Sequence, residues 1–218
     1  MLVLVLDTSS AAVTAGIVGI GDGVSLRAER VVHNARGHGE LLAPLIAECL
    51  AQAGATPVEL AAIVVGTGPG PFTGLRVGLV TAAVLAQTLE IPAYGVCSLD
   101  ALADQARDET ALLVATDARR KEVYWARYER GSRVVGPEVG RPTDVPTEGV
   151  TAAVGAGIEL YHDVFGVALL PGRFPTLGGL ARCAAERVRT AAPSEPLTPL
   201  YLRRPDAVAP GAPKAVTQ

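Results

Sequence analysis

Short apolar runs alternate along the chain with longer stretches in which apolar residues recur every three or four positions. The first run, Leu2-Val3-Leu4-Val5-Leu6, is continuous, which is typical of a strand buried on both faces. Segments 12–18 and 24–32 follow as two further strands, separated by a glycine-rich turn over 19–23. The pattern predicts two or three adjacent antiparallel strands at the start of the chain.

Two helical patterns come next. Residues 38–52 have apolar side chains at the spacing of one helix face, and Gly54 supplies the expected stop; this face consists of Leu41, Leu42, Leu45, Ile46, Cys49 and Leu50. A buried strand over 60–65 and a loop over 66–71 lead into a second helix, which begins at Phe72 or Thr73 and ends at Leu89, just before Ile91-Pro92.

The rest of the chain repeats this opening in part. We predict, in order, a strand over 93–96, a helix over 98–107 with Ser98 as N-cap, strands over 112–116 and 123–127, a glycine- and proline-rich loop over 131–149, a strand over 150–154 and a helix over 177–189.

The repeat predicts a protein of two lobes. Leu6-Asp7 and Thr116-Asp117 each end a strand at a carboxylate-containing turn, and a further strand follows each turn. We therefore expect an α/β protein with an N-terminal lobe over 1–104, a C-terminal lobe over 105–204 and a disordered, Pro/Ala-rich tail over 205–218.

Composition and charge narrow the function classes. The 218 residues carry a formal charge of −3, and only Arg119-Arg120-Lys121 and Arg203-Arg204 form basic clusters, which argues against autonomous, tight nucleic-acid binding. The three cysteines are too widely spaced for a zinc site or a disulfide framework. No basic leader precedes the first apolar run, and no apolar run approaches the ~18 residues of a membrane helix. We expect a cytoplasmic protein.

The glycine-rich loop over 66–74 is the densest turn signal in the chain. A phosphate cradle is one interpretation, but no Lys-Ser/Thr pair follows the last glycine, and Pro69 and Pro71 remove two N–H donors. We favour a rigid elbow between strand and helix. Its structural residues are Gly68, Gly70, Phe72, Thr73 and Arg76.

The helix after that loop has one face of small residues, because Gly74, Gly78, Ala82 and Ala86 recur every four positions. Glycine inside a helix costs up to ~1 kcal/mol, and close approach of another backbone is the physical offset. Two arrangements fit: the face packs on the protein's own sheet, or it receives a helix of another chain. Together with the leucine stripe of the preceding helix, it predicts a joint apolar surface of the kind used for dimerisation.

Asp7-Thr8-Ser9 places a carboxylate and two hydroxyls at the end of a buried strand. In sugar-kinase-like folds this position can contact a metal ion or phosphate; the alternative, which we favour, is a turn stabilised by bonds from the aspartate to the backbone. The bulky side chains of Arg119-Arg120-Lys121 argue against a nucleotide held between the lobes.

The three histidines do not form a recognisable metal or catalytic set. His33 and His38 lie five apart, whereas two ligands on one helical face need a spacing of three or four, so we interpret His38 as a lone surface histidine. His162 lies far along the chain, and no Ser-His-Asp set is indicated.

Several segments together resemble one family. They are Leu4-Val5-Leu6-Asp7-Thr8-Ser9, His38-x-x-Leu41-Leu42-x-Pro44, Gly68-Pro69-Gly70-Pro71-Phe72-Thr73-Gly74-Leu75-Arg76-Val77-Gly78, Asp117-Ala118-Arg119 with Glu122-Val123-Tyr124, and Pro199-x-Tyr201-Leu202-Arg203. Over residues 1–204 the chain is similar to the TsaB (YeaZ) family of bacterial tRNA threonylcarbamoyladenosine biosynthesis proteins. The Gly-Pro-Gly string is the most specific part; Pro71 stands where serine is more usual.

The resemblance implies an actin/Hsp70/sugar-kinase-like fold with duplicated topology and a reduced second lobe. It also implies a non-catalytic subunit that pairs with the threonylcarbamoyltransferase TsaD, is joined by the ATPase TsaE, can form a homodimer, meets tRNA only through the complex and needs no membrane or cofactor. TsaD ligates its metal through a His-x-x-x-His pair. Here His38 stands at the first position but Leu42 at the second, so the metal site is not carried over.

The resemblance further implies that the two N-terminal helices, over 36–52 and 73–89, form a helical bundle with the partner. The residues assigned to partner binding are His38, Leu41, Leu42, Leu45, Gly74, Gly78, Ala82 and Ala86, and Asp7, Thr8 and Ser9 are the remnant of a nucleotide site. An ATP-dependent kinase of the same fold and a metallopeptidase are the competing interpretations.

Overall fold

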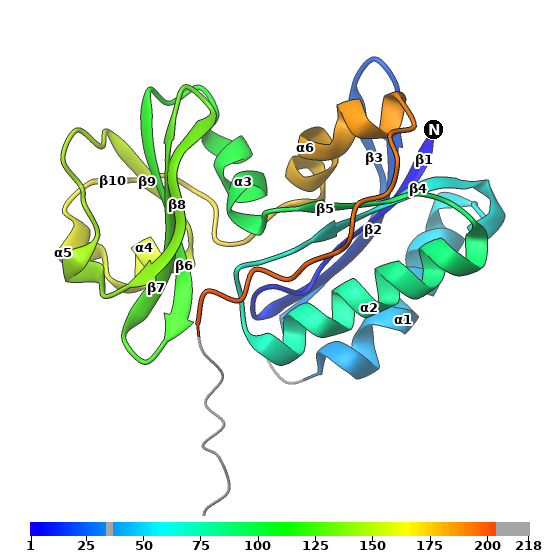
Figure 1. The fold of residues 1–218 in the computed structure, drawn as a ribbon, viewed down its shortest axis with the longest axis horizontal. Coiled ribbons are helices and arrows are strands. Elements are labelled where there is room, and N and C mark those ends of the chain that lie inside the picture. Colours follow the sequence, from blue (N-terminus) through cyan, green and yellow to red (C-terminus); the bar gives the residue numbers. More distant parts are fainter. Residues whose placement is uncertain (34–36, 204–218) are drawn as a thin grey trace, which may run out of the picture.

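Two lobes, each built on a five-stranded sheet, lie side by side in the computed structural model, which describes residues 1–33 and 37–203 (Figure 1). The predicted tail over 205–218 and Arg204 lie outside the described residues. The first sheet has the order β3-β2-β1-β4-β5, made of β1 (Leu2–Asp7), β2 (Ala12–Ile20), β3 (Val24–His33), β4 (Leu60–Gly66) and β5 (Ala93–Val96).

The second sheet repeats the first. Read from its β8 edge, its order is β8-β7-β6-β9-β10, made of β6 (Ala111–Arg119), β7 (Glu122–Glu129), β8 (Ser132–Gly140), β9 (Ala152–Val154) and β10 (Ala168–Leu169). In both sheets the first three strands form an antiparallel meander, the fourth strand pairs in parallel with the first, and the fifth pairs in parallel with the fourth. The shared strand order confirms the duplicated topology. The second lobe is reduced, because β9 and β10 have only three and two residues.

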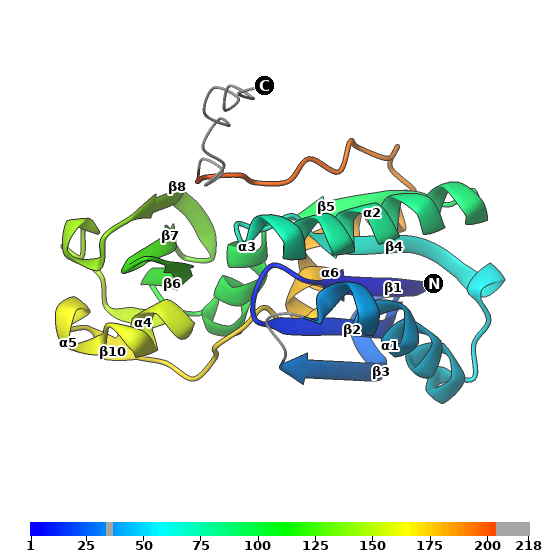
Figure 2. The same ribbon diagram turned by 90° about the horizontal axis from the view of Figure 1, so that it is seen from below.

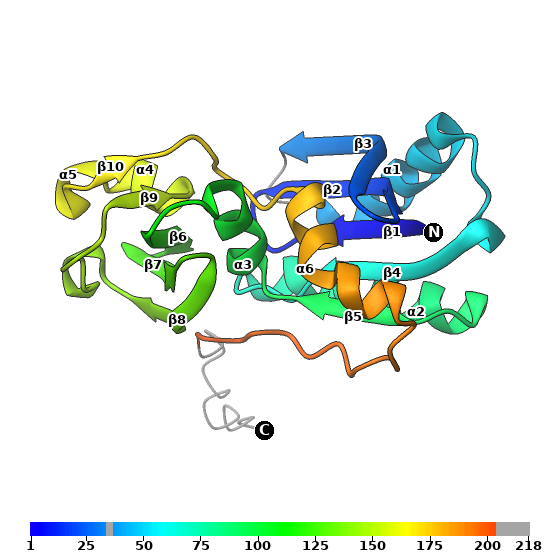
Figure 3. The same cartoon turned by 90° about the horizontal axis from the view of Figure 1, so that it is seen from above.

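Helices cover both faces of the first sheet. On one face, α1 (His38–Ala53) and α2 (Phe72–Leu89) pack side by side on Leu4, Leu6 and Ile63 (Figure 2). On the opposite face lies α6 (Leu177–Arg189), whose Leu180, Ala181 and Ala184 contact the alternate residues of β1 and β4 (Figure 3). The continuous apolar run of β1 is thus buried on both faces, as its pattern predicts.

The second sheet carries shorter helices. The helix α3 (Ser98–Ala103) lies between the lobes, packing on the second sheet and on α6. The helices α4 (Ala156–Leu160) and α5 (His162–Phe165) cover the other face. Three 3-10 turns complete the described elements, η1 (Pro57–Glu59), η2 (Asp104–Ala106) and η3 (Pro142–Asp144).

Four expectations from the sequence are corrected. The helix predicted over 98–107 ends as α3 at Ala103, and its N-cap is Cys97, without a side-chain bond. The loop predicted over 131–149 contains β8, an edge strand that pairs only with β7 and therefore tolerates Pro137. The boundary at 104/105 places α6 in the wrong lobe, because the helix packs on the first sheet. The fourth correction concerns the length and the apolar composition of α2.

The 18 residues of α2 have a mean hydropathy of 1.4, so this helix is long and apolar enough to cross a membrane, contrary to expectation. One such helix is weak evidence for a membrane span, because a helix that packs on a protein core can have the same composition. Here Leu75 and Leu79 of α2 lie in the core of the first lobe.

After α6 the chain returns to the second lobe as an extended segment over 192–203, which we call the strap (Figure 3). It is fixed to the first lobe by the bond from Ala93 N to Ser194 Oγ (3.0 Å) and by Leu200 N, which donates to Thr67 O (2.9 Å). It reaches the second lobe where Arg203 donates to Ala118 O (2.8 Å). The strap therefore bridges the two lobes.

Candidate functional site

The motif residues meet at the carboxyl ends of β1 and β4. The turn over 7–10 that follows β1 packs against the loop that leads from β4 into α2. A Cβ built on Gly70 would lie 2.0 Å from Ser9 O, and one built on Gly66 would lie 1.9 Å from Asp7 Oδ2. Glycine is required at both positions because the turn leaves no room for a side chain. The elbow interpretation of the loop agrees with this packing.

Asp7 is the polar centre of the turn and is only 2 % exposed. Its Oδ1 accepts bonds from Ser9 N (3.0 Å) and Ser9 Oγ (2.8 Å), and its Oδ2 accepts one from Ser98 Oγ (2.7 Å). Ser98 in turn accepts a bond from Gly68 N (3.2 Å). Both carboxylate oxygens of Asp7 thus tie β1, the elbow and α3 together, which is the turn-stabilising role favoured from the sequence.

Burial raises the pKa of Asp7 above its ordinary value of 3.8, although the bonds from Ser98 and Ser9 oppose the shift. The folded chain therefore holds a proton on Asp7 more tightly than the unfolded chain. As the pH rises from 3.8 to the raised pKa, the contribution of Asp7 to stability falls.

The upward direction of the Asp7 pKa shift gives a prediction about stability. We expect wild type to lose free energy of unfolding relative to Asp7→Asn as the pH rises from 3.8 towards neutrality, because the asparagine does not titrate. Urea unfolding of both proteins at a series of pH values measures the difference. A difference that stays constant, or that grows in favour of wild type, contradicts the raised pKa.

Thr8 explains the small-residue face of α2. Its hydroxyl donates to Gly74 O (2.8 Å) and accepts from Gly78 N (3.1 Å), the carbonyl and amide that a helix pairs across one turn. A Cβ on Gly74 would lie 2.6 Å from Thr8 O, and one on Gly78 would lie 2.4 Å from Thr8 Oγ1. The glycines thus admit a turn of the same chain, and His38, the first residue of α1, also lies against Gly74, with its Nε2 3.5 Å from where a Cβ would be.

The assignment of these side chains to partner binding is therefore corrected. The four small residues Gly74, Gly78, Ala82 and Ala86 are buried within the lobe, as are Leu42 and Leu45 of α1, and Leu41 is half-buried. His38 is also buried rather than a surface histidine, and its Nε2 lies 2.9 Å from Ser10 O. What α1 and α2 present to solvent is their other face.

That outward face is apolar in part. On α2, Val80 is 59 % and Val84 55 % exposed. On α1, Ala43, Pro44 and Ala47 are exposed. We call this surface the outer helix face. The sequence pattern alone did not indicate whether its side chains point to solvent or to the sheet.

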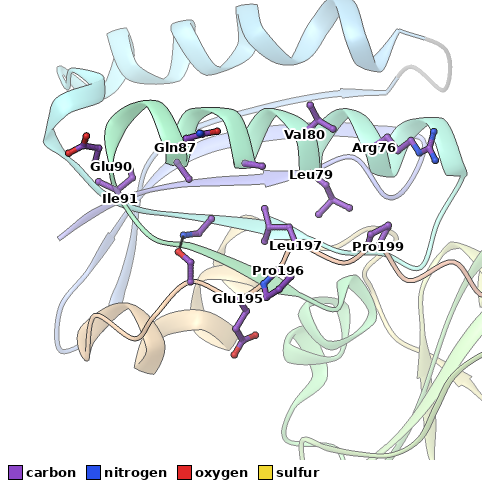
Figure 4. A pocket seen from close by; sticks show the side chains of 14 residues that line it. Arg76, Leu79, Val80, Gln87, Glu90, Ile91, Glu195, Pro196, Leu197 and Pro199 are labelled. Carbon is purple, nitrogen blue, oxygen red and sulfur yellow. Dashed lines mark hydrogen bonds between the residues drawn. The ribbon is translucent and has the colours of Figure 1, made fainter.

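A groove runs along one flank of the outer helix face, between α2 and the strap (Figure 4). Its volume is about 560 Å³. Leu79 and Val80 of α2 line one wall, and Pro196 and Leu197 of the strap line the other. Arg76 marks the end nearest the second lobe.

The remaining loop residues anchor the strap. The guanidinium of Arg76 lies over the ring of Phe72, 3.7 Å from its centroid, and Arg76 Nε donates to Tyr201 Oη (3.0 Å). The rings of Phe72 and Tyr201 are 4.8 Å apart. Thr73 is exposed in the first turn of α2. Tyr201 was not assigned to any site, although Pro199-x-Tyr201-Leu202-Arg203 is one of the segments that carry the family resemblance.

Within residues 1–33 and 37–203, no group of three or more His, Cys, Asp or Glu side chains is arranged to hold a metal ion.

Comparison with known proteins gives consistent results. A family model described as TsaD, tRNA N6-adenosine threonylcarbamoyltransferase, matches residues 31–163. An uncharacterised protein of Mycobacterium leprae is 50 % identical over 94 % of this chain, which spans 56 % of that relative's length. The tRNA threonylcarbamoyladenosine biosynthesis protein TsaB of Escherichia coli is 32 % identical over 142 residues, 59 % of this chain and 62 % of the relative.

Among solved structures, YeaZ from Pseudomonas aeruginosa is 26 % identical and superimposes with a TM-score of 0.77, covering 92 % of this chain and 99 % of the other. The duplicated sheets and this superposition confirm an α/β fold of two lobes with duplicated topology. The chain belongs to the TsaD family of proteins and, within it, to the TsaB (YeaZ) branch.

Proposed function

We propose that this chain is a non-catalytic subunit of the machinery that makes threonylcarbamoyladenosine in tRNA. Family membership supports the pathway, since TsaB of Escherichia coli is named for it. The bonding of Asp7 supports the accessory role: the carboxylate that could contact a metal or phosphate in a kinase of this fold already accepts three hydrogen bonds from its own chain.

The partner in this proposal is a TsaD-type threonylcarbamoyltransferase, which binds the outer helix face. The exposure of Val80 and Val84 is the observation that carries the assignment. Two apolar side chains four residues apart on a helix form a contact stripe for another helix. The groove beside α2 adds a recess for a partner side chain, since its walls are the apolar residues Leu79 and Leu197. A second copy of the chain uses the same face when the transferase is absent, and a TsaE-type ATPase joins the assembled pair.

The proposal is tested in a bacterial strain depleted of its own TsaB. The chain is expressed with and without the TsaD-type subunit of its own organism, and threonylcarbamoyladenosine in tRNA is quantified by mass spectrometry. We expect the modified nucleoside to return when the matched pair is present. Its continued absence, with both subunits soluble and the ATPase supplied, contradicts the proposal.

A further inference from the structure

The cleft between the lobes holds a concentration of arginine and aromatic side chains that the proposed partner surface does not use. A cavity of about 220 Å³ is lined by Arg119, Arg120 and Arg203 and by Phe72, Tyr124 and Tyr201. The chain has three Phe, five Tyr and one Trp, nine aromatic residues in all, so a third of them line this one cavity. Such a concentration in an aromatic-poor chain calls for a role beyond packing.

Cationic side chains are concentrated beside this cavity, although the chain as a whole is negative. Arg119, Arg120 and Lys121 form the tip of the hairpin between β6 and β7, and Arg203 lies beside it. Among the described residues, Asp117 lies 3.7 Å from Arg119 Nε, and Glu122 lies 3.3 Å from a terminal nitrogen of Arg203. Four cationic side chains thus gather at one place in a protein whose formal charge is −3.

The backbone of this hairpin tip is held in an unfavourable conformation. Arg119, Arg120 and Lys121 have φ angles of 65°, 52° and 64°, the left-handed region that costs side-chain-bearing residues about 1 kcal/mol or more each. Glycine would adopt it freely. Side chains that persist at such positions concentrate at functional sites, so three consecutive cations here point to a use for their charge.

A second cavity, of about 270 Å³, lies next to the first. The two share Pro71 and Arg119, and the second is lined further by Arg173 and Phe174. The Arg173 guanidinium lies 5.6 Å from the centre of the Phe174 ring, which repeats the arrangement of Arg76 over Phe72. Arginines and aromatic rings therefore follow one another through the cleft on both sides of the hairpin.

From this arrangement we infer that the cleft binds single-stranded RNA, such as a loop of the tRNA on which the proposed function rests. Unpaired bases stack on aromatic rings and guanidinium planes, while arginines contact the phosphates. Two adjacent cavities fit successive nucleotides. The subunit would then contact tRNA itself, in contrast to the expectation that it meets tRNA only through the complex.

The test uses glycine substitutions, since glycine is relaxed at positive φ and leaves the hairpin folded. Arg119→Gly with Arg120→Gly removes two cations from the cleft. The matched control is Arg130→Gly with Arg27→Ala: Arg130 has a φ of 49° at the next hairpin, and both control residues are exposed outside the two cavities of the cleft.

Binding of fluorescently labelled, unmodified tRNA to the purified chain is measured by anisotropy at several salt concentrations. We expect the cleft variant to bind about tenfold more weakly or worse, with a salt slope smaller by about 1.4, because each phosphate contact contributes about 0.7. The control variant should match wild type. Equal losses in both variants, no binding by wild type, or complete displacement of tRNA by excess ADP would each overturn the inference. Since this assay needs no partner, its failure is distinct from a failure to restore the modified nucleoside.

Discussion

Replacing Gly78 by leucine is expected to lower the free energy of unfolding by about 3 kcal/mol or more. The leucine Cβ alone would lie 2.4 Å from Thr8 Oγ1. Thr8 is buried and cannot swing into solvent, so moving it breaks the bonds to Gly74 O and Gly78 N and leaves buried polar groups without partners. Urea unfolding followed by circular dichroism measures the loss.

Gly39→Ala is the matched control for this change. Gly39 is also helical, but a Cβ there would meet only Val77, at 4.0 Å. We expect this variant to be as stable as wild type or up to about 1 kcal/mol more stable, because alanine favours the helix. If Gly78→Leu proved as stable as Gly39→Ala, the packing of Thr8 against α2 would not be what requires glycine.

A second large effect is expected at the outer helix face. Val80→Asp with Val84→Asp should weaken binding of the TsaD-type subunit by about 100-fold or more, equivalent to about 2.7 kcal/mol. The cause is that two carboxylates would be buried in the apolar contact between the outer helix face and the partner. Both valines are more than half exposed, so the free chain should fold normally. Calorimetric titration with the partner measures the affinity, and the same variant should lose self-association.

The control is an equal change elsewhere on the surface. Val58→Asp with Val134→Asp introduces the same two charges at valines that are 83 % and 49 % exposed, in η1 and β8. This variant should bind the partner as wild type does. Equal weakening by both double variants would indicate a general charge effect and would remove the outer helix face from the proposal.

The sequence predicted most helices and strands because their apolar periods are regular. The sequence did not predict features that depend on contacts between residues far apart in the chain. The four-residue spacing of Gly74 and Gly78 revealed a close approach, but not that the approaching group is Thr8, 66 and 70 residues earlier. The amphipathic period of α6 marked a buried face without indicating which sheet buries it. In β8, Gly136-Pro137 resembles a turn, and only its position at the sheet edge makes it compatible with a strand.

The sequence predicted which residues belong to the candidate site better than it predicted how they are arranged in space. Asp7 and the glycine loop were recognised from their types and their places after buried strands. Ser98, which donates to Asp7 from 91 residues away, has no local signal as a site residue. The sequence shows Arg119 and Arg120 as bulky residues in a basic cluster, but it gives neither their φ angles nor the aromatic rings that face them.

The strap makes two distant surfaces share one piece of chain. Pro196 and Leu197 form a wall of the groove beside α2, and a few residues later Tyr201 and Arg203 line the cleft between the lobes. A protein bound in the groove and an RNA bound in the cleft would therefore both contact this short segment. Binding of one would then weaken or strengthen binding of the other through the position of the strap. By thermodynamic linkage, whatever factor the partner imposes on RNA affinity, RNA must impose on the affinity for the partner.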